Sequence, residues 1–290
     1  MCVDLLFVCN CTTIRGDISD SNVRRHWARI RGDLAVIVAK RVGIGVVIAT
    51  AVLSGLACIY YVLTVVAARQ DTAALVAAAL RGNGDRLNTS DLNPERLAWL
   101  IKIEDPAFFR HQGVDLSTPG AGMTTITQGL VKLLYFPDGF RAGVSKIRQT
   151  LIAEYGLDAQ VSKDDQLRLL LNIAYFGEVA GQSVHGFGQA SHVYFGKEFD
   201  QLSDEQYLEL VAMLMGPNAF KPGSQALAER MRRIHEYLAG ARKPASLLDV
   251  EYNGVQRGSS AQEVFIWLLG RLTHAVPESP APAGAEQPKT

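Results

Sequence analysis

Glu104 is the residue of this sequence whose position most clearly favours acid–base chemistry. Apolar residues recur at helical spacing from Leu97 onward, and Glu104 follows Leu97 by seven positions, so it continues the apolar stripe of a helix predicted over residues 94–104. Burial of a carboxylate raises its pKa towards the range that a general base or acid needs. Pro106 ends the helix and leaves Glu104 facing a loop. The alternative is a structural glutamate held by His111 or by an arginine.

A glycine-rich segment, residues 122–132, leads into the next predicted helix. Thr124, Gln128 and Lys132 are spaced by four and therefore share one helical face, whereas Ile126 and Leu130 lie on an apolar face opposite. Hydroxyl, amide and ammonium groups on one face suit a ligand that is rich in oxygen. A solvated helix surface would show the same pattern.

Several cations lie within and just after this segment. From residue 132 to residue 148, Lys132, Arg141, Lys146 and Arg148 stand against a single acid, Asp138. Guanidinium and ammonium groups beside a helix start suit a phosphate or a pyrophosphate, so all four are candidate substrate-binding residues. Taken by themselves they also fit a solvated basic surface.

The composition is that of a folded protein without a strong charge bias. The 290 residues include 29 basic and 29 acidic residues and are 48% hydrophobic, which excludes a disordered chain and a polycationic nucleic-acid binder. The four cysteines all lie at or before Cys58, so neither a disulfide framework nor a cysteine-rich metal site is expected after it.

An uncharged stretch of 27 residues, Val42 to Ala68, predicts a membrane anchor. As a helix it would rise about 40 Å, which exceeds the roughly 30 Å of a hydrocarbon core and the length of a cleaved signal segment. Six cations occupy the 18 residues before it and three the 18 residues after it. This bias predicts a single-pass membrane protein with a cytoplasmic N-terminus and a body on the opposite side of the membrane. The alternative is a buried core helix of a soluble protein.

The rest of the chain has a helical pattern with few alternating strands. Helices are predicted over residues 72–80, 94–103, 125–134, 145–160, 164–173, 204–215, 227–238 and 261–272. We expect a cytoplasmic segment at residues 1–41, an anchor at 42–68, a domain at 71–275 and a disordered, proline-rich tail at 276–290.

Residues 104–115, Glu-Asp-Pro-Ala-Phe-Phe-Arg-His-Gln-Gly-Val-Asp, resemble the first signature of the glycosyltransferase family 51 peptidoglycan polymerases at every fixed position. Residues 122–133 resemble the second signature, with Thr124 in place of serine, Gly129 in place of glutamine and Leu133 in place of asparagine. Residues 171–177 and 194–197 follow in the family's order, and the resemblance extends from about residue 71 to residue 222.

This resemblance implies a mostly α, lysozyme-like, two-lobed domain behind a single N-terminal transmembrane helix. The implied reaction polymerises lipid II into glycan strands, with inversion at C1 and release of undecaprenyl pyrophosphate. Glu104 matches the family's general base. Lys132, Arg141 and Arg148 match residues that contact the leaving pyrophosphate, and Thr124 and Gln128 match residues that contact donor oxygens. A divalent cation such as Mg or Mn is also implied, as is a location in the inner (plasma) membrane with a periplasmic catalytic domain.

Residues 145–149 depart from the family's third signature, because Gln149 stands where the family has a glutamate that orients the acceptor or the metal. We therefore expect reduced activity, and we keep open a pseudoenzyme that binds lipid II or a partner synthase. A lysozyme-like lytic enzyme would also use one glutamate, but it would have no use for a pyrophosphate-binding cluster. The residues after Pro222 are too few for a transpeptidase domain, so we expect a monofunctional protein. The expected partners are lipid II, lipid-linked glycan, the membrane and other cell-wall synthases.

Overall fold

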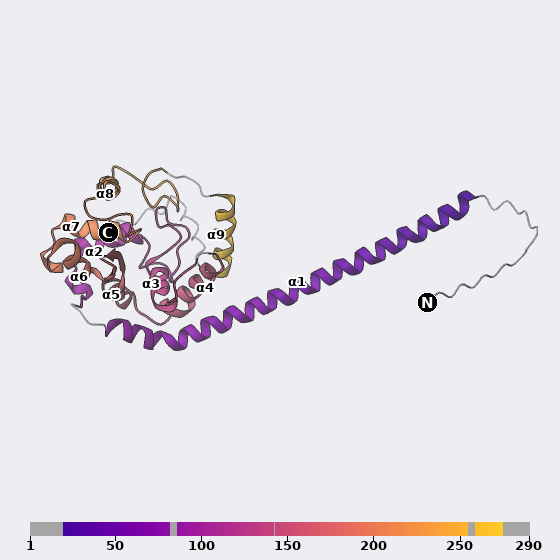
Figure 1. The fold of residues 1–290 in the computed structure, drawn as a ribbon, viewed down its shortest axis with the longest axis horizontal. Helices are drawn as coiled ribbons and strands as arrows, with labels where there is room; N and C mark the ends of the chain where they lie inside the picture. The colour runs from indigo at the N-terminus through magenta and orange to yellow at the C-terminus, as the bar shows by residue number, and fades with distance from the viewer. Residues whose placement is uncertain (1–19, 82–85, 142, 255–258, 275–290) are drawn as a thin grey trace, which may run out of the picture. The chain divides into compact units, whose positions relative to one another are not determined.

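The computed structural model describes residues 20–81, 86–141, 143–254 and 259–274. The expected tail at 276–290 and the first 19 residues of the expected cytoplasmic segment lie outside the described residues. The chain divides into two units, Met1–Ile59 and Tyr60–Thr290. Figure 1 shows their elements, labelled in chain order.

The long helix α1 (Asp20–Leu80) contains the whole uncharged stretch and is longer than predicted, because it continues without a break through the separately predicted helix at 72–80. Its apolar side chains are exposed, with Val47 at 68% and Leu53 at 67%. Within the described residues it is the one helix that is long and apolar enough to cross a membrane. Because the apolar side chains of residues 42–59 are exposed, this part of α1 is not the buried core helix considered as the alternative.

The second unit is built mainly from short helices, as predicted. These are α2 (Pro94–Glu104), α3 (Ile126–Tyr135), α4 (Val144–Ile152), α5 (Lys163–Ile173), α6 (Phe187–Phe195), α7 (Asp204–Met213), α8 (Gln225–Leu238) and α9 (Ser260–Leu272), with shorter turns at η1 (Thr89–Asp91), η2 (Ala153–Asp158) and η3 (Phe199–Gln201). The strands β1 (Tyr175–Val179) and β2 (Gln182–His185) form an antiparallel hairpin that the sequence pattern did not predict.

Side-chain caps explain where several helices begin. The Asn93 side chain accepts a hydrogen bond from the Arg96 N–H, and Pro94 occupies the first turn of α2. Ser203 and Gln206 form a capping box at α7. The helix predicted over 145–160 is divided, because α4 passes into the π-helical turn η2 at Ala153.

A continuous apolar core joins α2, α3, α5, α6 and α7. Leu100, Leu130, Leu169, Phe187 and Leu210 are fully buried within it. α7 contacts α2, α6 and α8, and α3 contacts α4 and α5. α2 also contacts α8, and residues from the end of α2, the start of α3 and the middle of α8 line one cavity although these elements are far apart in the sequence.

Candidate active site

A cavity of about 460 Å³ lies where these elements meet. It is lined by the end of α2, residues 120–125, the cavity side of α3, the end of α5, the start of β1, residues 214–217 and single residues from α8 and the loop after it. Its charged or strongly polar lining residues include Glu104, Thr124, Lys132 and Arg230. The cavity therefore combines one carboxylate with two cations.

Glu104 is the last residue of α2, as predicted, and its carboxylate lines the cavity. Desolvation raises its pKa from 4.5 to about 7, although the positive charge of Arg230 acts in the opposite direction. Among the described residues, none makes a hydrogen bond or an ion pair with this carboxylate. His111, one of the two partners that the structural alternative named for Glu104, bonds to Asp105 instead. Glu104 can therefore take up a proton from a ligand near neutral pH.

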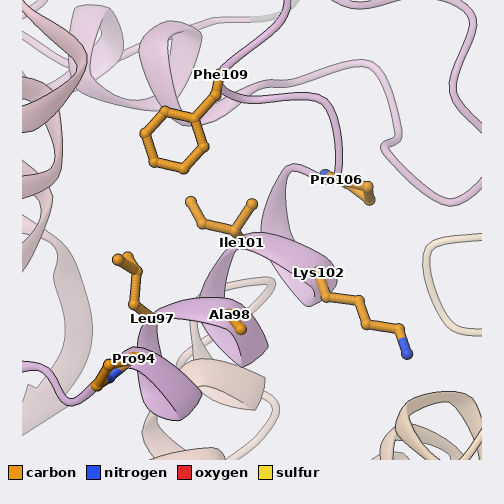
Figure 2. Close-up of a pocket in the computed structure, with 7 residues that line it drawn as sticks. All are labelled: Pro94, Leu97, Ala98, Ile101, Lys102, Pro106 and Phe109. Carbon is orange, nitrogen blue, oxygen red and sulfur yellow. The ribbon is translucent and has the colours of Figure 1, made fainter. Parts of the chain in front are cut away.

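The predicted buried face of α2 was partly wrong. Arg96, Leu100 and Ile103 are its buried residues, whereas Leu97 and Ile101 are only partly buried. Leu97 and Ile101 line a separate apolar groove of about 410 Å³ together with Phe109. Lys102 is the one charged residue in the lining of this groove, and in Figure 2 its amine points away from Phe109.

Asp105, the residue after Glu104, joins the end of α2 to the start of α3 through hydrogen bonds of its side chain. Its buried carboxylate accepts hydrogen bonds from the Ile126 N–H at 3.0 Å and from Nε2 of His111 at 3.0 Å. His111 Nδ1 in turn accepts the Gly113 N–H at 3.0 Å, which assigns the proton to Nε2. This chain of bonds fixes the end of α2 against the start of α3, so that Glu104 and Thr124 line the same cavity.

The glycine-rich segment passes close to another part of the backbone. Gly120 and Gly122 have φ angles of +82° and +70°, and their N–H groups donate to carbonyls of residues 246 and 247. A Cβ on Gly122 would lie 2.7 Å from Cγ1 of Val250. Glycine is therefore required here for both conformation and space.

The structure does not bring Gln128 to the cavity. α3 begins only after Thr125, so the expected face of Thr124, Gln128 and Lys132 does not form. The Gln128 side chain is fully buried, where it accepts the Thr125 N–H at 3.0 Å and donates to Oγ1 of Thr150 at 2.9 Å. The cavity side of α3 carries Ile126, Gly129, Lys132 and Leu133 instead.

One of the four predicted cations lines the cavity, and a second is hydrogen-bonded to a lining residue. Lys132 lines it, and the buried Lys146 donates a hydrogen bond from Nζ to Oγ1 of Thr124 at 3.0 Å. Burial and the nearby charge of Lys132 lower the pKa of Lys146 from 10.5 to about 7. The other two predicted cations do not line the cavity. Arg141 is exposed, and the guanidinium of Arg148 lies 4.9 Å from the centre of the Phe136 ring.

Gln149 also lies outside the cavity lining. Only 1% of it is exposed, and its Nε2 donates a hydrogen bond of 2.6 Å to the backbone carbonyl of Gln128. Its Oε1 is buried and has no hydrogen-bond partner among the described residues. In this structure Gln149 supports the packing of α4 on α3.

Arg230 is a charged residue of the cavity that the sequence prediction missed. It is 2% exposed on α8, and it donates hydrogen bonds to the carbonyls of Ala212 at 3.0 Å and Val250 at 3.1 Å while lining the cavity. The sequence does contain a signal for Arg230, because this residue lies on the apolar face that Leu227, Met231 and Ile234 form. Glu104 was found by the same kind of signal, a charged residue that continues the apolar stripe of α2.

Residues 73–240, more than half of the chain, match the family model described as Transglycosylase. The chain belongs to this transglycosylase family. It is 35% identical over 160 residues to penicillin-binding protein 1B of Buchnera aphidicola and 32% identical over 136 residues to penicillin-binding protein 1B of Escherichia coli. These alignments cover 50% and 42% of this chain but only 21% and 16% of the two relatives. A predicted transglycosylase of Cupriavidus necator is 27% identical over 169 residues, which are 54% of this chain and 71% of that protein.

The match places this chain in glycosyltransferase family 51, the family that the signatures at residues 104–115 and 122–133 indicated. It includes α2 to α8 and every residue of the cavity lining except Val250, and it ends before α9.

The cavity of this transglycosylase does not offer a ligand set for the expected divalent cation. Glu104 is the one carboxylate in its lining, and Lys132 and Arg230 add positive charge. Within the described residues, no group of three or more His, Cys, Asp and Glu side chains could hold a metal ion. Mg²⁺ is usually held by one or two carboxylates together with waters and substrate phosphates, so this lining supplies one such ligand but no complete site of its own.

Proposed function

We propose that this transglycosylase is a membrane-anchored peptidoglycan glycosyltransferase that joins lipid II units into glycan strands. The observation that carries the proposal is the Glu104 carboxylate, whose pKa is about 7 and which lines a cavity shared with cations and a hydroxyl. Displacement of a pyrophosphate by an alcohol requires both a base and positive charge.

In the proposed reaction the 4-hydroxyl of the acceptor sugar loses its proton to Glu104 and forms a bond to C1 of the donor sugar. The bond from C1 to the pyrophosphate oxygen breaks with inversion at C1, and undecaprenyl pyrophosphate leaves with the bonding electron pair. General base catalysis of this kind contributes about 10² to 10⁴ in rate. Asp105 and His111 hold Glu104 in place through the start of α3.

Positive charge at the cavity would stabilise the leaving pyrophosphate. Lys132 lines the cavity, and Lys146 is hydrogen-bonded to Thr124 in the same lining. An anion beside Lys146 favours its charged form and therefore raises its pKa above about 7. The positive charge of Arg230 lowers the pKa of Glu104 and so favours the ionised form of its carboxylate.

The anchor and its orientation belong to the same proposal. Residues 42–68 cross the inner membrane, the N-terminus is cytoplasmic and the part of the second unit after residue 68 is periplasmic. The cavity then lies on the side where lipid II is used. Other cell-wall synthases are proposed partners. No step above uses a divalent cation, because the cavity lining supplies one carboxylate and no complete ligand set. A cation is proposed on the family resemblance alone.

The test is incubation of the purified full chain with fluorescent lipid II, with and without Mg²⁺ or Mn²⁺, followed by gel separation. A ladder of glycan strands supports the proposal, and the Glu104→Gln variant should abolish it. Bound but unpolymerised lipid II would contradict it.

One observation favours a second candidate, a pseudoenzyme that binds lipid II without polymerising it. Gln149 is neutral and buried, and Gly129 and Leu133 give the cavity no polar group where the family has amides. The same assay separates the two candidates, because a pseudoenzyme would bind fluorescent lipid II and leave no ladder.

A further inference from the structure

α9 has apolar residues on both of its sides. Leu269 is fully buried, and Phe265 and Ile266 pack against the core of the second unit. The outward side carries four exposed apolar residues, Val264 (65%), Trp267 (61%), Leu268 (36%) and Leu272 (39%). A helix that packs on the core of a soluble protein normally presents polar residues to water. The outward side of α9 therefore indicates contact with an apolar environment.

The C-terminal end of α9 is fixed on η2. Oη of Tyr155 donates a hydrogen bond of 3.1 Å to the carbonyl of Leu272. The buried carboxylate of Glu154 accepts the N–H of His274 at 3.0 Å. α9 also contacts α4, beside which it lies in Figure 1.

The same turn, η2, contacts the end of the uncharged stretch of α1. Nη1 of Arg69 donates a hydrogen bond of 2.7 Å to the carbonyl of Tyr155. Ala68 is buried, and a Cβ on Gly156 would lie 3.8 Å from the Cβ of Ala68. Tyr155 is therefore bonded both to the last residue of α9 and to the first charged residue after residues 42–68.

We propose that α9 lies in the membrane–water interface, with its outward apolar side against lipid. The inference rests on the proposed anchoring by residues 42–68, which puts Arg69 at head-group level. Tyr155 and Leu272 are then at the same level, because hydrogen bonds connect all three. Trp267 suits this zone, and Arg271, whose guanidinium lies 5.5 Å from the centre of the Trp267 ring, suits the phosphates of anionic lipids.

The role of this contact is to restrain the catalytic unit. A single spanning helix leaves the unit free to rotate about that helix, whereas a second contact restricts its tilt over the lipid surface. Because α9 lies beyond residues 73–240, this restraint is additional to the part of the chain that matches the family.

The experiment measures the contact of Trp267 with lipid in the full chain. Trp27→Phe removes an exposed tryptophan of α1 and leaves Trp99 and Trp267. This variant is reconstituted into vesicles of phosphatidylcholine and phosphatidylglycerol whose acyl chains are brominated near the head group. The emission of Trp267 is the difference between this variant and the same variant with Trp267→Phe. If α9 is interfacial, bromine should quench at least about half of that difference, because interfacial helices bury their apolar side at the level of the upper acyl chains. The remaining emission, from the partly buried Trp99, should be little quenched.

A separate variant reports on the anchor. Leu53→Trp, made in the background of Trp27→Phe and Trp267→Phe, places an exposed tryptophan within residues 42–68. Quenching of Leu53→Trp by deeply brominated lipid without quenching of Trp267 would overturn the interfacial helix and point to a protein partner or a second copy on this face. Quenching of neither would overturn the anchor and the helix together. Neither readout depends on glycan synthesis, so failure of the proposed activity is recognised separately.

Discussion

Gln149 Nε2 donates a hydrogen bond of 2.6 Å to the backbone carbonyl of Gln128, from a position that is 1% exposed. The bond joins α4 to α3 behind the cavity wall. An amide is suited to this site because it has a proton to donate to a carbonyl, whereas an ionised carboxylate has none.

We expect Gln149→Glu to lose stability as the pH rises and to gain no activity. The carboxylate would face a carbonyl oxygen in a buried site, while Lys146 is bonded to Thr124 and Arg148 stacks on Phe136. The folded-state pKa of the new Glu should therefore lie above its unfolded value of about 4.3. Stability is then lost as the pH rises from that value, by about 1 to 3 kcal/mol near pH 8.

Thermal unfolding in detergent at several pH values measures this loss. Gln149→Leu is the matched control, because it keeps the volume, removes the unpartnered oxygen and should have the same effect at every pH. More glycan from Gln149→Glu than from the parent would show that this position does limit catalysis, as the family pattern implied.

Glu104→Gln should lower glycan synthesis at least about 100-fold, because the amide keeps the shape of the side chain but cannot accept a proton. Binding of fluorescent lipid II should persist. Glu95→Gln, on the exposed first turn of the same helix, is the matched control and should retain the activity of the parent. Equal turnover by Glu104→Gln and the parent would mean that another group takes the proton.

The kcat/KM for lipid II should have a narrow maximum near pH 7. Glu104 must be ionised, so the rate rises as the pH rises through its pKa of about 7. Lys146 must be charged, so the rate falls as the pH rises through its own pKa of about 7. Lys146→Met should lower the maximum and remove the alkaline fall while the acid limb stays. A parent profile that is flat between about pH 6 and 8 would contradict both assignments.

Lys132→Ala and Arg141→Ala should differ, although the sequence treats the two cations alike. Lys132 lines the cavity, and loss of a charged contact to pyrophosphate lowers kcat/KM by roughly 10- to 100-fold. Arg141 is exposed and outside the cavity, so its loss should cost less than about fivefold. Steady-state kinetics with fluorescent lipid II compares them. Equal losses would place Arg141 in contact with the substrate.

The sequence by itself determined the features that depend on near neighbours along the chain. Pro106 ends α2 so that Glu104 is its last residue, and Asn93 and Ser203 begin α2 and α7, because caps and helix ends involve groups within a few residues of each other. The length of the uncharged stretch likewise needs no tertiary information. The signatures then identified the family.

Only the tertiary structure decided which of the candidate residues meet. Periodicity marks a helical face but not the element that covers it, so Gln128 was expected in the site and is instead buried against Thr150 of α4. Arg230 lies 126 residues after Glu104 in the sequence and enters the same cavity because α8 packs on α2 and α7. The raised pKa of Glu104 is a tertiary property for the same reason, since desolvation comes from every element that surrounds the carboxylate.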